Sequence, residues 1–214
     1  MKNLVWKAKI GVLVGSAFLL AGVAQAASSI TVNGTAAIHG SFGMSTNLDG
    51  TATNAYVEDQ SPNAEGRYVM DFWVNRGTLT FPANTSVRIG AVGTTGGGQH
   101  FIVFLKKNPN NTIHLNTWHL NDTGSYVFGC TIFLSNATAS VARQFHIDYK
   151  TPTAPGANDG SVDIRRVDNG NGCTLTGLDN DSKTADSVRW GVLSGSGSNA
   201  TGSYYFDDFV STRN

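Results

Sequence analysis

The carboxylates that could hydrolyse a glycosidic bond are few in this 214-residue sequence, and their spacing does not suit the reaction. A retaining glycosidase needs two carboxyl groups about 5–5.5 Å apart. Residues i and i+2 of a strand supply such a pair, because they share one face. The two glutamates are Glu58, which precedes Asp59 directly, and Glu65, which follows a turn. Neighbouring strand residues point to opposite faces, so we expect these polar side chains to hold a loop together, with Arg67 as an ion-pair partner.

Histidine, serine and calcium-loop motifs also fail to define a catalytic or metal site. No Gly-x-Ser-x-Gly sequence leads into a helix, and Ser194–Ser198 reads as a flexible loop. His114 and His119 are five positions apart, which on a strand places them on opposite faces. Asp179–Asp181 lacks the glycine and glutamate of an EF-hand loop, so we expect an Asx turn there. The metal-site spacings are missing for the five histidines: His39, His100, His114, His119 and His146.

The first 26 residues read as a signal peptide. Three lysines precede an apolar stretch from Ile10 to Val23, and Ala24-Gln25-Ala26 supplies the small-x-small pattern of a cleavage site. A membrane span needs about 20 apolar residues, so a retained anchor is the weaker alternative. We therefore expect residues 1–26 to be removed, which leaves a single secreted domain, residues 27–214, in an extracellular or periplasmic setting.

The composition excludes two classes of protein. Only 14% of the residues are charged, and loss of the three leading lysines leaves 12 basic against 15 acidic side chains. Nucleic-acid binding would need clustered Lys and Arg, so we expect no nucleic-acid partner. Apolar residues make up 40% of the chain and occur in short bursts, which excludes a disordered chain.

The elements that must position any site are strands. In Arg67 to Asn75, apolar side chains alternate with polar ones, so that Tyr68, Met70 and Phe72 share one face. Gly-, Asn- and Pro-rich turns separate such runs, and helical periodicity is absent after the signal peptide. About a dozen strands at this spacing predict an all-β sandwich or barrel. Other alternating or apolar runs are Phe101 to Leu105, Phe145 to Lys150, Val162 to Val167 and Ser187 to Val192.

Seven segments, in order along the chain, resemble the concanavalin A-like, or laminin G-like, jelly-roll superfamily. The resemblance is to a module of secreted bacterial proteins whose function is largely unassigned. It implies a two-sheet antiparallel jelly-roll sandwich, preceded here by the helix of the signal peptide. The segments are His39–Gly43, Tyr56–Tyr68, Phe145–Tyr149, Asn158–Ile164, Leu178–Asp181, Ser187–Gly191 and Gly202–Phe209.

The resemblance leaves the function open, because this superfamily includes lectins, adhesion modules, glycosidases and lyases. Its lyases carry Arg, Gln, His and Tyr on a concave sheet. Gln99, His100, Tyr126 and His146 supply these types only in scattered positions, so we assign no catalytic residue. We expect a non-catalytic recognition or adhesion module that binds a glycan. The alternatives are a polysaccharide-active lyase or hydrolase, and a structural envelope or matrix protein; the oligomeric state is open.

Two tryptophans could form a glycan-binding platform, in which an aromatic face stacks on a sugar ring beside polar groups. Trp73 shares a strand face with Asp71 and Asn75. Trp118 shares one with His114 and Asn116, which we include as glycan-binding residues. The alternative is that each tryptophan packs the second side of a sheet or lies under a loop.

Asp207 and the two cysteines are the remaining candidates. Asp207 lies in a terminal run of aromatic residues, and the resemblance suggests a structural Ca²⁺ there, with backbone carbonyls of His39 to Phe42 as further ligands. The alternative is a hydrogen-bonded aspartate, or one paired with Arg213 or Arg67. Cys130 and Cys173 form either a disulfide, as an exported protein allows, or two buried free thiols.

Overall fold

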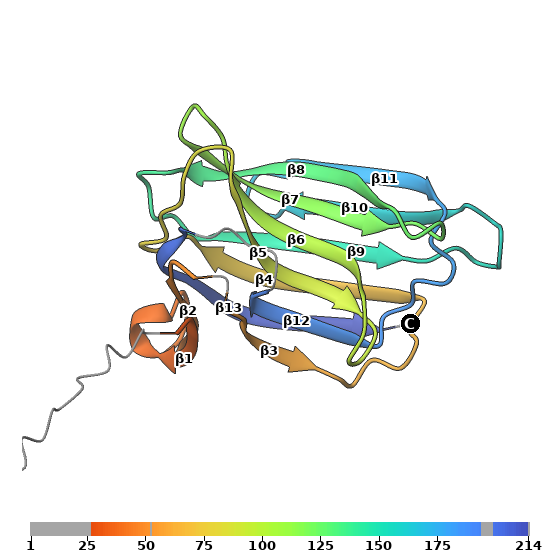
Figure 1. Ribbon diagram of the computed structural model, residues 1–214, viewed down its shortest axis with the longest axis horizontal. Helices are drawn as coiled ribbons and strands as arrows, with labels where there is room; N and C mark the ends of the chain where they lie inside the picture. Colours follow the sequence, from red (N-terminus) through yellow and green to blue (C-terminus); the bar gives the residue numbers. More distant parts are fainter. Residues whose placement is uncertain (1–26, 52, 194–198, 214) are drawn as a thin grey trace, which may run out of the picture.

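The chain forms two stacked antiparallel β-sheets in a computed structural model that describes residues 27–51, 53–193 and 199–213 (Figure 1). The seven-stranded sheet has the order β1-β2-β13-β4-β9-β10-β11, and the six-stranded sheet has the order β3-β12-β5-β6-β7-β8. The strands are β1 Ser29–Asn33, β2 Gly43–Asp49, β3 Ala55–Asp59, β4 Arg67–Asn75, β5 Ser86–Gly93, β6 Gln99–Lys107, β7 Thr112–Leu120, β8 Tyr126–Asn136, β9 Arg143–Lys150, β10 Gly160–Arg166, β11 Gly172–Leu178, β12 Ser187–Val192 and β13 Thr201–Arg213.

This architecture confirms the predicted all-β jelly-roll sandwich. One short 3₁₀ turn, Gly34–Ala36, lies between β1 and β2. Within the described ranges, no helix is long and apolar enough to cross a lipid bilayer. The expected signal-peptide helix lies outside the described residues.

The core lies between the sheets and is built by the predicted alternation. Tyr68, Met70 and Phe72 of β4 are buried, as are Phe145 and Ile147 of the adjacent strand β9. Each such side chain contributes roughly 1.5–3 kcal/mol by leaving water. The rings of Phe72 and Phe145 stack at 6.1 Å. The inner faces of both sheets therefore close over one apolar interior, and functional side chains are left to the outer faces and the edges.

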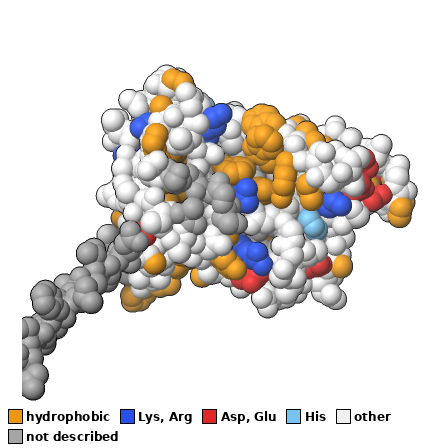
Figure 2. All heavy atoms as spheres, in the orientation of Figure 1, with side chains coloured by type: hydrophobic (Ala, Val, Ile, Leu, Met, Phe, Trp, Pro, Cys, Tyr) orange, Lys and Arg blue, Asp and Glu red, His pale blue; other side chains and the backbone are white. Residues whose placement is uncertain are grey.

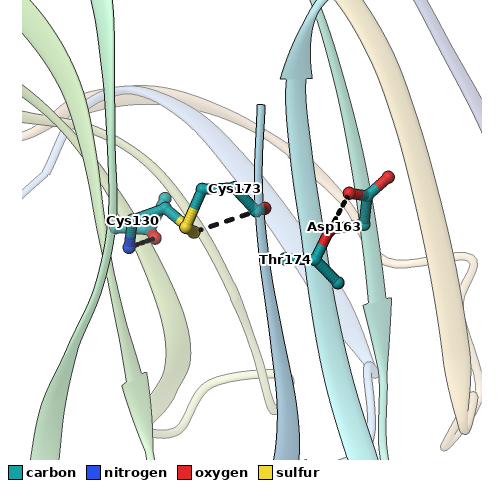
Figure 3. Close-up of a disulfide and its surroundings, with 5 residues drawn as sticks. Cys130, Asp163, Cys173 and Thr174 are labelled. Carbon is teal, nitrogen blue, oxygen red and sulfur yellow. Dashed lines mark hydrogen bonds between the residues drawn. A yellow bond between two sulfur atoms is a disulfide. The ribbon is translucent and has the colours of Figure 1, made fainter. Parts of the chain in front are cut away.

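A disulfide closes one lateral edge of the sandwich. Cys130 of β8 and Cys173 of β11 are bonded, with their Cα atoms 5.8 Å apart (Figure 3). These are the last strands of the two sheets on that side. The bond confirms the disulfide and excludes the free-thiol alternative. It closes a loop of 43 residues, which in the chain-entropy view stabilises the fold by about 4 kcal/mol.

Candidate active site

The outer face of the six-stranded sheet carries a depression of about 300 Å³. The sheet lies nearer the viewer in Figure 1, and Figure 2 shows apolar side chains gathered along the middle of this face, with Lys and Arg side chains beside them. The lining residues come from four adjacent strands, β5 to β8: Arg88, Ile102, Phe104, Trp118 and Tyr126. The depression thus combines aromatic surface with one cationic and one phenolic group.

Two irregularities in the pairing of β5 with β6 place polar groups in this depression. The register shifts between Arg88 and Gly90, and again between Val92 and Gly93. In a regular strand Gln99 would share the inner face with Phe101, which is buried in the core. At the second shift β6 has one additional residue, so the Gln99 side chain instead reaches Arg88 on the outer face. Bulges often re-aim side chains at functional sites in this way.

Arg88, Gln99 and Tyr126 are linked by hydrogen bonds. Arg88 Nη1 donates to Gln99 Oε1 at 2.6 Å, and the Tyr126 hydroxyl donates to the Gln99 backbone carbonyl at 2.7 Å. The guanidinium carbon lies 5.3 Å from the ring centre of Phe104. Burial lowers the pKa of Arg88, because the charged form loses hydration. The guanidinium is therefore held rigidly among aromatic groups, and its hydrogen-bonded partner is neutral.

The pairing of Arg88 differs from that of the other described arginines. Six of them have a carboxylate oxygen within 3.4 Å of a guanidinium nitrogen: Arg67, Arg143, Arg165, Arg166, Arg189 and Arg213. Arg76 donates to two backbone carbonyls. Within the described ranges, Arg88 alone offers a half-buried guanidinium whose side-chain partner is an amide. A half-buried cation without a counter-charge is stabilised by an anionic ligand.

The predicted platform at Trp118 lies along the same face. The Trp118 ring is 38% exposed, and the Phe128 ring stands nearly perpendicular to it at 5.9 Å. His114 and Asn116 precede Trp118 on β7. His114 Nε2 lies 3.0 Å from the Thr112 hydroxyl. Asn116 is only 6% exposed, and its Oδ1 has no hydrogen-bond partner in the described part of the chain. The structure therefore brings these three predicted residues onto the face that carries Arg88.

Trp73 lies on the other sheet. It belongs to β4 of the seven-stranded sheet, where the ring of His39 meets it edge-on at a centroid distance of 4.6 Å. Its strand neighbour Asp71 accepts from His146 Nδ1 at 2.9 Å. The two predicted tryptophans therefore cannot act on one sugar residue.

Of the scattered lyase-type residues, the structure brings Gln99 and Tyr126 together but not the histidines. His100 is buried, its Nδ1 lies 3.1 Å from the Thr184 carbonyl, and burial lowers its pKa. His146 lies on the seven-stranded sheet. Arg88 was not singled out from the sequence. The signal available there was a single arginine inside the otherwise apolar or small run from Val87 to Gly93.

Asp207 makes hydrogen bonds to backbone amides. Its Oδ2 accepts from the amides of Ile38 and His39 at 2.7 and 2.8 Å, and its Oδ1 accepts from Asp208. Burial raises the pKa of Asp207, but these bonds outweigh it and the pKa lies below its ordinary value. Among the residues that the structure describes, no three His, Cys, Asp or Glu side chains gather as a metal site would require. Calcium at Asp207 stays a prediction.

The arginine partners expected from the sequence are wrong. Arg213 pairs with Asp59 at 2.8 Å, and Arg67 pairs with Asp148 at 2.8 Å. Neither therefore neutralises Asp207, and Arg67 does not pair with the glutamates before it. Glu58 pairs with Arg189 instead, at 2.8 Å. These pairs depend on which distant strands lie side by side, and local sequence spacing does not reveal that.

Comparisons with known proteins identify similar folds among solved structures. No protein-family model matches the sequence, and no curated protein matches it significantly. Among solved structures, an endo-β-1,4-glucuronan lyase from the fungus Trichoderma reesei has a TM-score of 0.59 at 11% identity, over 87% of each chain. The cellulose-induced protein Cip1 has a TM-score of 0.58 at 17% identity, over 88% of this chain and 87% of that one. An alginate lyase from Alteromonas sp. 272 has a TM-score of 0.51 at 10% identity, over 86% and 94%.

These neighbours correct the functional expectation. The expectation was a non-catalytic recognition module, whereas two of the three are named as lyases, one of glucuronan and one of alginate. They favour the alternative of a polysaccharide-active enzyme. At such low identity the likeness establishes the architecture, and residue roles must come from the site itself. The chain has the concanavalin A-like jelly-roll fold that these structures share.

Proposed function

We propose that this chain is a polysaccharide lyase that cleaves a uronate-containing glycan on the outer face of the six-stranded sheet. One observation carries the proposal: Arg88 is a half-buried cation held by a neutral amide in an aromatic depression. A uronate carboxylate supplies the missing negative charge, and a guanidinium binds a carboxylate through two parallel hydrogen bonds.

The proposed reaction is a β-elimination. A base removes the proton from the ring carbon that bears the carboxylate, the adjacent carbon–oxygen bond to the next sugar breaks, and the departing oxygen receives a proton. One product carries a new carbon–carbon double bond, and no water is consumed. Negative charge spreads onto the carboxylate in the transition state. Arg88 and Gln99 would stabilise it there, an effect worth about 10²–10³ in rate for a single donor.

Tyr126 is the proposed proton-transfer group. Its hydroxyl is anchored to the Gln99 carbonyl at 2.7 Å, so it lies beside the group that would bind the carboxylate. The side chain is also open to solvent and to an incoming chain. General acid–base catalysis by a positioned side chain contributes about 10²–10⁴ in rate.

Trp118 would hold a neighbouring sugar of the same polymer. Its exposed ring offers an apolar plane, and a pyranose stacks on such a plane through its C–H groups. Trp73, on the opposite sheet, would serve only a separate glycan contact.

We also infer that the protein works outside the cytoplasm. The disulfide between Cys130 and Cys173 supports this, because such bonds persist in oxidising compartments. The predicted signal peptide agrees with it, and polymeric uronates are too large to enter a cell before cleavage.

The experiment is an elimination assay on glucuronan and alginate, with the carboxyl-reduced form of each polymer as the control. Formation of unsaturated ends is followed by ultraviolet absorbance. We expect the chain to cleave at least one native polymer and neither reduced polymer. Arg88→Ala should lower kcat/KM about 10²–10³-fold, whereas Arg165→Ala, which removes a paired arginine of the other sheet, should not. Full activity of Arg88→Ala would overturn the assignment.

A further inference from the structure

A second cavity, of about 380 Å³, lies at the lateral edge opposite the disulfide. There β1 ends the seven-stranded sheet and β3 ends the six-stranded sheet. We call it the edge groove, and none of its lining residues lines the candidate active site. They are Val32, Phe42, Gly43, Met44, Val57, Glu58, Asp59, Val188, Trp190, Phe206, Asp207, Asp208 and Phe209.

Three aromatic rings form a corner in the edge groove. The ring of Trp190 lies 5.2 Å from that of Phe206 and 5.8 Å from that of Phe209, with interplanar angles of 65° and 60°. Trp190 and Phe206 are nearly buried, whereas Phe209 is 39% exposed at the surface. Of the three rings, Phe209 is therefore the one that is open to an incoming ligand, and a cation is attracted to the face of an aromatic ring.

Four carboxylates line the same groove, and none of its lining residues is Lys or Arg. Each carboxylate has a partner outside the lining set. These partners are Arg189 for Glu58, Arg213 for Asp59, the amides of Ile38 and His39 for Asp207, and the His39 ring for Asp208. Arg189 and Arg213 thereby neutralise Glu58 and Asp59, whereas Asp207 is held by backbone amides, which leave its negative charge without a counter-charge at the groove. Asp208 is the most open of them, with about half of its side chain exposed.

We propose that the edge groove binds an organic cation: an ammonium group, preferably alkylated, carried on a small apolar body. The aromatic corner and the apolar wall take the alkyl groups, and the carboxylates complement the charge. A neutral ligand of the same shape lacks the electrostatic part, and an anionic ligand is repelled. The groove therefore differs in charge preference from the Arg88 site, and both sites can be occupied at once.

The test titrates the mature chain with choline and, separately, with the neutral isostere in which carbon replaces the nitrogen, and follows chemical shifts by NMR. We expect saturable binding of choline and binding of the isostere weaker by about tenfold. Phe209→Ala and Asp208→Asn should each weaken choline binding by a similar factor. Both positions are substantially exposed, and asparagine tolerates the positive φ of 49° at residue 208.

The matched control is Val210→Ala. Val210 is exposed beside Phe209 but does not line the groove, so choline binding should not change. Uronan cleavage should be unaffected by all three variants, which separates this proposal from that of the lyase. Equal affinity for choline and its isostere, no choline binding, or binding of Ca²⁺ in place of choline would each overturn the proposal.

Discussion

The outer faces of the two sheets differ in how their charges are paired. On the seven-stranded sheet, Arg67 pairs with Asp148, and Asp163 pairs with Arg165. Asp163 also accepts from the Thr174 hydroxyl, as Figure 3 shows. On the six-stranded sheet, Arg189 pairs with Glu58. Arg88 differs, because among the described residues its side-chain partner is the amide of Gln99 alone, and aromatic rings surround it. Ion pairs stabilise a surface slightly, whereas a half-buried cation without a counter-charge favours an anionic ligand. This difference is the basis for assigning the proposed substrate site to the six-stranded sheet.

Removal of the Tyr126 hydroxyl should cause the largest loss of activity among these variants. Tyr126→Phe is expected to lower kcat about 10²–10⁴-fold with little change in KM, because it removes proton transfer but keeps the ring. Steady-state elimination kinetics measure this. Tyr56→Phe is the control, since Tyr56 is a similarly exposed tyrosine on β3 of the same sheet. Equal losses in both variants would remove Tyr126 from the mechanism.

Loss of the disulfide should lower stability by about 4 kcal/mol and should also disturb the active face. Cys130 lies on β8, the last strand of the six-stranded sheet, which also carries Tyr126 and Phe128. The double variant Cys130→Ser/Cys173→Ser tests this by urea unfolding and by activity well below its Tm. Reduced stability with unchanged activity would show that β8 is positioned by its pairing with β7 alone.

The pH dependence of the free energy of unfolding should also distinguish the outer faces of the two sheets, by a smaller amount. Burial raises the pKa of Asp163, but hydrogen bonds from Thr174 and Arg165 outweigh it and leave the pKa below its ordinary value. Asp163 therefore stabilises the fold above the unfolded pKa of about 3.9, and this contribution is lost as the pH falls through the lower folded value. We expect Asp163→Asn to cost about 1 kcal/mol or less at neutral pH.

The Asp163→Asn variant should also show a shallower loss of stability below pH 4 than the unaltered chain, as unfolding at a series of pH values would show. Arg88→Gln should leave that acid limb unchanged, because Arg88 has no carboxylate partner in the described chain. An identical acid limb for Asp163→Asn and the unaltered chain would contradict the pairing.

Sequence alone predicts the strands well and the site only in part. Tyr68, Phe72, Phe145 and Ile147 are identified because a sheet with one core face imposes a period of two. Gln99 is misplaced by the same rule, because the extra residue of β6 changes its face. The isolation of Arg88 depends on the register of four strands, and the pairing of Arg213 with Asp59 depends on how β13 of one sheet lies against β3 of the other. Such information is absent from local patterns.

The most direct test of the account is a binding cycle on Arg88. Calorimetry in the Tyr126→Phe background, in which cleavage is expected to be slow, compares a glucuronate oligosaccharide with its carboxyl-reduced form, each with and without Arg88→Gln. We predict that either single change weakens binding about 10- to 100-fold, and that the two together weaken it no further. Strictly additive losses, or unchanged affinity for Arg88→Gln, would show that the carboxylate is bound elsewhere and would contradict the central claim.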